Sequence, residues 1–189
     1  MFTFVLGLFL FLGVHSVSIF AEPLRDKLVA KSELGWKALY SLISLAGLFF
    51  IIKGYADIRL SPTLIFVAPY WLRHLTMLMM IPAFILFLAP YFPSRIGKVT
   101  RHPQLISIML WALSHLFVNG NIVDLLLFGS FLVWAMVDII SMRQRQQRKL
   151  TTFKASGIND LILVVVGLLL YGAYLIYLHG ALIGVPLIS

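Results

Sequence analysis

The sequence predicts an all-α fold, a polytopic membrane helical bundle of about six transmembrane helices. Of the 189 residues, 61% are hydrophobic and only 12% are charged, which is about half the charged fraction of an ordinary soluble domain. The apolar residues form continuous runs instead of alternating with polar ones, and runs of about 20 residues are what helices need to cross a bilayer. We expect residues 1–189 to form a single integral membrane domain.

The first half of the chain predicts three spanning helices. Residues 2–20 resemble a signal peptide in length, but no basic residue precedes the apolar run and no small-x-small pattern follows it, so we expect this run to remain as the first helix. The next helices are predicted at 37–57 and 71–90. Pro82 lies inside the third helix and should kink it, because its ring removes one backbone hydrogen bond.

The second half predicts three more helices, at 103–118, 122–141 and 160–180. Pro103 suits the first turn of a helix, where its missing N–H would be unpaired in any case. The short Asn-Gly-Asn turn that follows Val118 predicts that the fourth and fifth helices are antiparallel neighbours. The basic, glutamine-rich loop at 142–159 is predicted to be a solvated turn over anionic headgroups.

The distribution of basic residues predicts the orientation. The first, third and fifth connections carry twelve Lys and Arg residues, the second carries three, and the fourth and both termini carry none. Basic loops stay in the cytoplasm, so both termini are expected to face away from it, in a bacterial inner membrane. Because topology explains the net charge of +8, we expect lipid and no nucleic acid as a partner.

The chain contains no cysteine, which excludes disulfides, thiolate ligands and a cysteine nucleophile and leaves imidazole as the strong metal ligand. Two of the five histidines, His15 and His115, fall inside apolar runs, where an unpaired imidazole is costly. The others, His74, His102 and His179, lie near predicted span ends.

Small or hydroxyl residues flank His15, so that a flat molecule has access to the backbone there, and His115 lies one turn after Trp111. A core histidine bonded to a neighbouring carbonyl explains either residue alone. Two such residues in one small bundle favour joint ligation of a porphyrin iron.

Arg101 and His102 stand at the start of the fourth predicted helix, where donors and the positive helix end suit a propionate or a phosphate. The alternative is that both side chains extend to the membrane interface. We therefore take Arg101, His102 and Trp111 as candidate heme-binding residues beside the two histidines.

The depths of the two histidines allow two pairings. At about 1.5 Å per residue, His15 lies about 8 Å and His115 about 20 Å from the cytoplasmic ends of their helices, whereas two axial ligands of one iron share one depth. Either the fourth helix begins outside the hydrocarbon and its far end turns back within the membrane, or His15 pairs with His102.

Six stretches carry a family resemblance: "LGVHS" (12–16), "WKALYSLISLAGL" (36–48), "PYWLRHL" (69–75), "RHPQ" (101–104), "LWALSHLFVNGN" (110–121) and "LLLFGSFLVWAMVD" (125–138). Together they resemble the NnrU family of bacterial membrane proteins, most strongly over residues 1–141. The resemblance implies a link to denitrification, through expression or assembly of nitrite and nitric oxide reductase activity.

The NnrU family is in turn similar to the plant 15-cis-zeta-carotene isomerase, a heme b protein of plastid membranes. Its ligand histidines lie in a first-helix His-Ser motif and a Leu-Trp-x-x-x-His motif, which implies His15 and His115 as heme ligands here. The isomerase has a cysteine, proposed to exchange with histidine at the iron, where this chain has Ala112. A ligand exchange of that kind is therefore not expected.

Three functions follow as hypotheses. The first is a heme b-binding protein, isomerase-like or a redox-sensing accessory factor, with an apolar small molecule as substrate if it is an enzyme. The second is a non-catalytic assembly factor whose histidines only pair helices. The third is a methyltransferase that uses S-adenosylmethionine, because the Arg-His-Pro turn also resembles isoprenylcysteine methyltransferases; Gln104 stands where that family has a tyrosine.

Overall fold

The computed structural model describes residues 1–145 and 155–188, and these residues are almost entirely helical. Their only non-helical pairing of note is one isolated antiparallel bridge, between Leu64 and Asn121. The chain forms two compact units, unit 1 with residues 1–68 and 119–145 and unit 2 with residues 69–118 and 146–189. The predicted all-α class is confirmed.

All six predicted apolar segments are helical. Within the described residues, five are long and apolar enough to cross a membrane: Phe2–Phe20, Glu33–Arg59, Leu72–Tyr91, Ile122–Ser141 and Gly157–Ile183. The sixth, Pro103–Val118, has 16 residues, so its length of about 24 Å falls short of a hydrocarbon core of about 30 Å. The protein is a multi-pass membrane protein.

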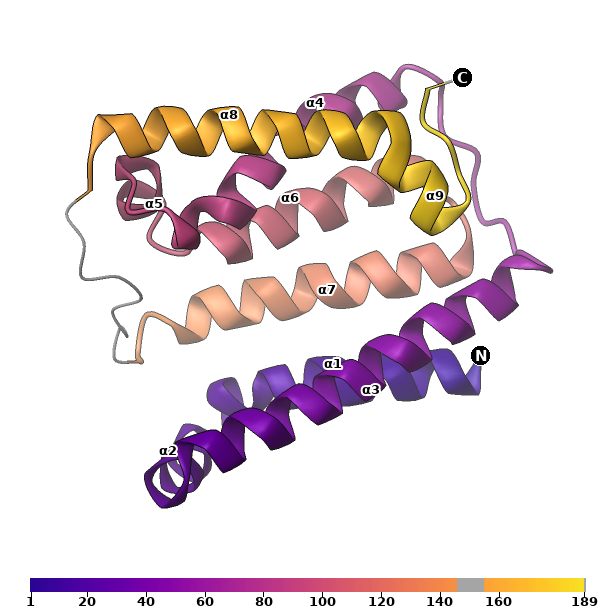
Figure 1. The fold of residues 1–189 in the computed structure, drawn as a ribbon. Coiled ribbons are helices and arrows are strands. Elements are labelled where there is room, and N and C mark those ends of the chain that lie inside the picture. Colours follow the sequence, from indigo (N-terminus) through magenta and orange to yellow (C-terminus); the bar gives the residue numbers. More distant parts are fainter. Residues whose placement is uncertain (146–154, 189) are drawn as a thin grey trace. The chain divides into compact units, whose positions relative to one another are not determined.

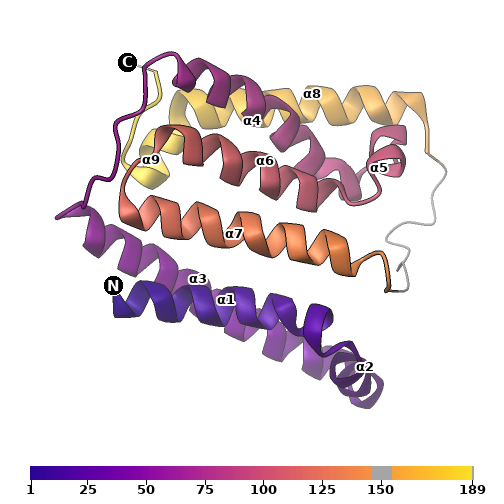
Figure 2. The same ribbon diagram turned by 180° about the vertical axis from the view of Figure 1, so that it is seen from behind.

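Unit 1 contains α1 (Phe2–Phe20), α2 (Glu22–Lys31), α3 (Glu33–Arg59) and α7 (Ile122–Ser141). Helices α1 and α3 run side by side in both ribbon views (Figures 1 and 2). Glycines let their backbones approach: a Cβ atom added to Gly7 would lie 2.5 Å from the amide nitrogen of Ile51, and one added to Gly47 would lie 2.6 Å from that of Phe11. The order of these contacts makes the two helices antiparallel.

The core of unit 1 forms where α1, α3 and α7 meet. It contains Phe4, Leu8, Ile51 and Val123. Aromatic and aliphatic side chains pack around it, among them Phe11 and Phe131, whose ring centroids lie 5.6 Å apart. This packing fixes α7 against α1 and brings the polar side chains of α7 close to those of α3.

The segment before residue 69 is attached to the start of α7. The amide nitrogen of Ile65 donates to the carbonyl oxygen of Gly120 (2.7 Å), and that of Ile122 donates to Thr63 (3.0 Å). Residue 120 must be glycine, because a Cβ atom there would collide with the carbonyl oxygen of Phe66. The carbonyl oxygen of Gly120 in the Asn-Gly-Asn turn is therefore paired with backbone amides of the preceding segment.

Unit 2 contains α4 (Leu72–Leu88), α5 (Arg95–Thr100), α6 (Pro103–Val118), α8 (Gly157–Ala173) and α9 (His179–Ile183). A 3-10 turn, η1 (Ala89–Tyr91), extends α4, and a π-helical segment, η2 (Tyr174–Leu178), joins α8 to α9. Pro82 lies inside α4 and Pro103 begins α6, as predicted.

Hydroxyl groups hold α4 against its neighbours in unit 2. Ser107 of α6 donates to the carbonyl oxygen of Ala83 (2.7 Å), and Tyr171 of α8 donates to that of Met77 (2.9 Å). These bonds lie inside an apolar bundle, where each satisfied hydroxyl also serves as a helix contact.

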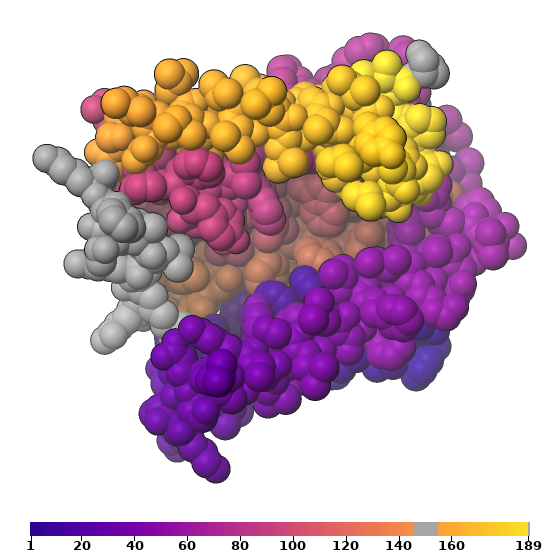
Figure 3. Space-filling model, viewed as in Figure 1, coloured from indigo at the N-terminus to yellow at the C-terminus, as the bar shows by residue number. Residues whose placement is uncertain are grey.

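Many large apolar side chains of the spanning helices are exposed, as lipid contact requires. In Figure 3 the surfaces of α3 and α8 are visible along most of their lengths. Large hydrophobic residues are exposed on both helices, among them Leu42, Phe49 and Ile52 on α3, and Leu161 and Leu169 on α8.

Two predictions lie beyond what the structure describes. Helix α6 ends at Val118 and α7 begins at Ile122, as predicted, but these helices belong to different units. Their antiparallel pairing therefore stays a prediction. Residues 146–154 of the predicted solvated loop lie outside the described residues.

Candidate functional site

His15 lies near the end of α1 in unit 1 and is half-buried. Its Nδ1 atom is 2.6 Å from the backbone carbonyl oxygen of Phe11, one turn earlier. A carbonyl oxygen can only accept, so the hydrogen is on Nδ1 and the lone pair of the neutral ring is on Nε2. Nε2 is the nitrogen that such a ring offers to a metal.

Aromatic rings from three helices surround His15. The imidazole stacks on Phe11, with centroids 4.3 Å apart, and contacts Tyr40 of α3 at 5.0 Å. Trp134 of α7 meets it edge-on, at 5.9 Å and 90°. These rings fix the plane of the imidazole, and their flat faces suit an equally flat ligand.

A buried ion pair lies one turn beyond Trp134 on α7. Asp138 accepts from Arg145, and the two side chains are only 11% and 10% exposed. Arg145 also donates to the hydroxyl of Ser141 (2.6 Å). Sequence reasoning missed this pair because it counted Arg145 as an orientation signal; a carboxylate inside a predicted span was the signal that could have revealed it.

A second buried carboxylate, Asp124, lies in the first turn of α7 and is 3% exposed. It accepts from the hydroxyl of Tyr55 on α3 (2.5 Å) and from the side-chain amide of Asn121 (3.0 Å). Asn121 was expected to be costly in lipid unless paired, and this hydrogen bond pairs it. The contact also joins α3 to α7 at the end of unit 1 remote from His15.

His115 lies on α6 in unit 2 and is half-buried. Its Nδ1 atom is 2.8 Å from the carbonyl oxygen of Trp111, and the two ring centroids are 5.6 Å apart. Trp111 and His115 are therefore neighbours, as their spacing predicted. The hydrogen bond sets the same tautomer as in His15, with the lone pair on Nε2.

Arg101 and His102 precede α6 in unit 2. Arg101 is exposed and has a φ angle of 59°, which an arginine rarely adopts. His102 is half-buried, and its amide nitrogen donates to the carbonyl oxygen of Thr100 (2.6 Å). This tight turn leads directly into Pro103, the first residue of the helix.

The two remaining histidines have other contacts. His74 is exposed and meets the ring of Tyr70 edge-on at 5.4 Å. His179 has its Nδ1 atom 2.6 Å from the carbonyl oxygen of Val185, which ties the start of α9 to the segment after it.

The predicted ligand residues divide between the units. His15 is the one histidine of unit 1, whereas Arg101, His102, Trp111 and His115 belong to unit 2. The predicted pairings of His15 with His115 or His102 therefore stay predictions. Residues 1–145 and 155–188 contain no group of three or more His, Cys, Asp or Glu side chains that could hold a metal ion. A porphyrin supplies four ligands itself and needs only axial ones.

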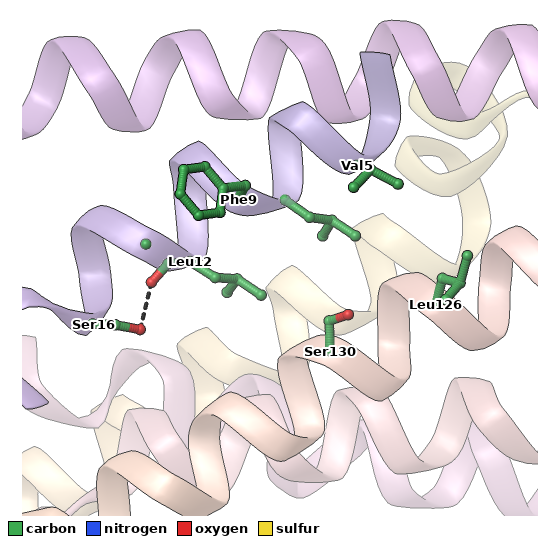
Figure 4. Close-up of a pocket in the computed structure, with 8 residues that line it drawn as sticks. Val5, Phe9, Leu12, Ser16, Leu126 and Ser130 are labelled. Carbon is green, nitrogen blue, oxygen red and sulfur yellow. Dashed lines mark hydrogen bonds between the residues drawn. The ribbon is translucent and has the colours of Figure 1, made fainter. Parts of the chain in front are cut away.

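A groove with a volume of about 380 Å³ runs between α1 and α7 in unit 1 (Figure 4). Its lining is mostly aliphatic and includes Gly13 and Ser16, which flank His15 in the sequence. The hydroxyl of Ser16 donates to the carbonyl oxygen of Leu12 (2.6 Å), and a Cβ atom on Gly13 would meet nothing within 4 Å. The groove therefore offers a hydrocarbon-like surface along α1, although His15 itself is not one of its lining residues.

Comparison with protein families identifies the family to which the chain belongs. A family model described as "NnrU protein" matches residues 3–187. The chain belongs to the NnrU family. No curated protein and no solved structure matched it. The match reaches beyond residue 141 and includes α8, so the NnrU assignment applies to both units.

Proposed function

We propose that this NnrU protein is an integral membrane heme b-binding protein, with His15 and His115 as axial ligands. Its function would be that of an accessory factor, redox-sensing or isomerase-like, in nitrite and nitric oxide reductase expression or assembly. The denitrification setting comes from the family resemblance. The heme assignment rests on the setting of the two histidines.

The imidazole rings of His15 and His115 make the same kind of hydrogen bond, and this observation supports heme binding. Each imidazole has Nδ1 on the carbonyl oxygen one turn earlier, at 2.6 Å for His15 and 2.8 Å for His115. Metal-ligating histidines almost always use their second nitrogen in this way, because the bond fixes the tautomer and ring orientation and raises the basicity of the ligating nitrogen.

The surroundings of His15 fit a porphyrin. Phe11, Tyr40 and Trp134 present aromatic rings around the imidazole, and their flat faces suit a macrocycle. When bound, heme b supplies one-electron chemistry. The residues of the chain hold the ring, exclude water and set the basicity of the ligands.

The same hydrogen bonds also support a second function, the non-catalytic assembly factor. An imidazole bonded to its own helix backbone is satisfied without any metal. This function predicts a colourless protein in which His15→Ala and His115→Ala only lower stability.

Absorption spectra of protein purified from heme-replete cells separate the two functions. We expect a Soret band in the wild type, its loss or displacement in His15→Ala and His115→Ala, and no change in His74→Ala, which alters an exposed histidine. A wild type without a Soret band would favour the assembly factor. Loss of the band in His102→Ala but not in His115→Ala would transfer the second ligand to His102.

A further inference from the structure

Two buried side-chain nitrogens have no hydrogen-bond partner among the described residues: Trp134 Nε1 and Arg145 Nε. Both belong to unit 1. The indole and guanidinium nitrogens can only donate a hydrogen bond. Buried donors are nearly always paired in folded proteins, so the partner they lack is a hydrogen-bond acceptor.

The first of these donors is next to His15, because Trp134 contacts the imidazole edge-on. Arg145 reaches back to Asp138, which is one turn after Trp134 on the same face of α7. The unpaired donors therefore follow one path from the histidine to the end of α7.

The side chain of Arg145 has the burial and the donor geometry needed to bind a carboxylate. Nine-tenths of its side chain is buried. One terminal nitrogen serves Asp138 and Ser141, while Nε has no partner. A guanidinium carries five N–H donors in a planar fork, so one edge can hold Asp138 while another receives a second carboxylate. Asp138 balances the positive charge in the absence of a ligand.

We propose that Arg145, together with Trp134, binds the carboxylate-bearing end of the flat ligand that His15 ligates. This inference rests on the proposed function, in which that end is a propionate of heme b. Sequence reasoning assigned the acidic group to Arg101 and His102 of unit 2. Arg145 provides a side chain that can bind this acidic group in the same unit as His15.

The test compares two forms of the ligand on heme-free protein in lipid nanodiscs. Hemin has free propionates, whereas hemin dimethyl ester has the same ring and iron but no anionic group. Charge-assisted hydrogen bonds are about twice as strong as neutral ones, so we expect wild-type protein to bind hemin about tenfold more tightly than the ester. Titration followed at the Soret band gives both dissociation constants.

Variants identify the residues responsible for this preference. Arg145→Gln should bring the two dissociation constants to within about twofold of each other, because the cationic donor is gone. The matched control is Arg143→Gln, which removes the same charge from an exposed residue two positions earlier and should keep the preference. Trp134→Phe keeps a ring beside His15 but removes the N–H, and should weaken hemin binding about threefold.

Arg145→Gln also breaks the ion pair with Asp138. The double variant Arg145→Gln/Asp138→Asn controls for this, because it removes both charges and leaves neither unbalanced. It should also lack the preference for hemin. Equal affinity of the wild type for both ligand forms, or a preference that survives Arg145→Gln, would overturn this inference and leave the heme assignment intact. Failure of wild-type protein to bind either form would overturn the proposed function itself, and this inference with it.

Discussion

Asp124 and Asp138 are buried carboxylates, and each has partners that offset its loss of hydration. Asp124 accepts from Tyr55 and Asn121, and Asp138 accepts from Arg145. A carboxylate without such partners would be costly in an apolar bundle. The sequence shows both acids near the ends of a span, but Tyr55 is 69 residues from Asp124, so only the packing of α3 against α7 reveals that contact.

Substitution of Tyr55 tests the first of these contacts. Tyr55→Phe keeps the ring and removes the hydroxyl that donates to Asp124, so we expect a loss of about 1–3 kcal/mol in the free energy of unfolding. Denaturant unfolding in detergent, followed by circular dichroism, measures it. The matched control is Tyr177→Phe, which changes a side chain that is 70% exposed and should have almost no effect. Equal unfolding midpoints for the two variants would show that the Tyr55–Asp124 bond adds no stability.

The positions of His15 and His115 were predictable from sequence because an imidazole inside an apolar run is conspicuous. Their hydrogen bonds to Phe11 and Trp111 follow from helix geometry, which puts the carbonyl four residues earlier within reach. The contacts of His15 with Tyr40 and Trp134 were not predictable, since they depend on which faces of three helices meet.

Among the elements, the long apolar helices were predicted well and the short polar ones were missed. Helix α1 and helix α7 have the predicted bounds, because uninterrupted apolar runs define them. Helices α2 and α5 have 10 and 6 residues and no apolar stripe that could have indicated them. Helix α3 continues at both ends beyond the predicted range, from Glu33 to Arg59, into residues that the sequence had assigned to connections.

The short length of α6 bears on the depth of His115. Two backbone groups of the turn after it are paired, since Gly120 accepts from Ile65 and Ile122 donates to Thr63. Non-helical backbone is tolerated at membrane depth only when it is satisfied in this way. The position of His115 relative to His15 stays a prediction.

Close approach of α1 to α3 depends on glycine, which makes a second prediction. Gly47→Ala puts a methyl group against the backbone of Phe11, so we expect a loss of about 1–3 kcal/mol in the free energy of unfolding from overpacking. The control is Gly129→Ala on α7, where a Cβ atom meets nothing within 4 Å; it should be neutral or slightly stabilising, because alanine favours the helix. Thermal unfolding in detergent compares them, and a Gly47→Ala protein as stable as the control would mean that the helices can separate at no cost.

For the whole molecule, the family match spans both units, and the distribution of charge predicts how the chain crosses the membrane. Twelve of the 15 Lys and Arg residues lie in the first, third and fifth connections. We therefore propose that these connections face the cytoplasm and that both termini lie on the opposite side.

The absence of cysteine makes this orientation directly measurable. Single variants Lys31→Cys, in the first connection, and Ser61→Cys, in the second, both place a thiol at an exposed position. A membrane-impermeant maleimide applied to spheroplasts should label Ser61→Cys at once and Lys31→Cys only after lysis. The reverse pattern would place both termini in the cytoplasm.

The proposed function depends most on two imidazoles bound to one iron, and low-temperature electron paramagnetic resonance of the oxidised, purified protein tests this most directly. We expect a low-spin ferric signal typical of two imidazole ligands, which turns high-spin in His15→Ala and in His115→Ala. A protein without a heme iron signal, or a low-spin signal that both variants leave unchanged, would contradict it.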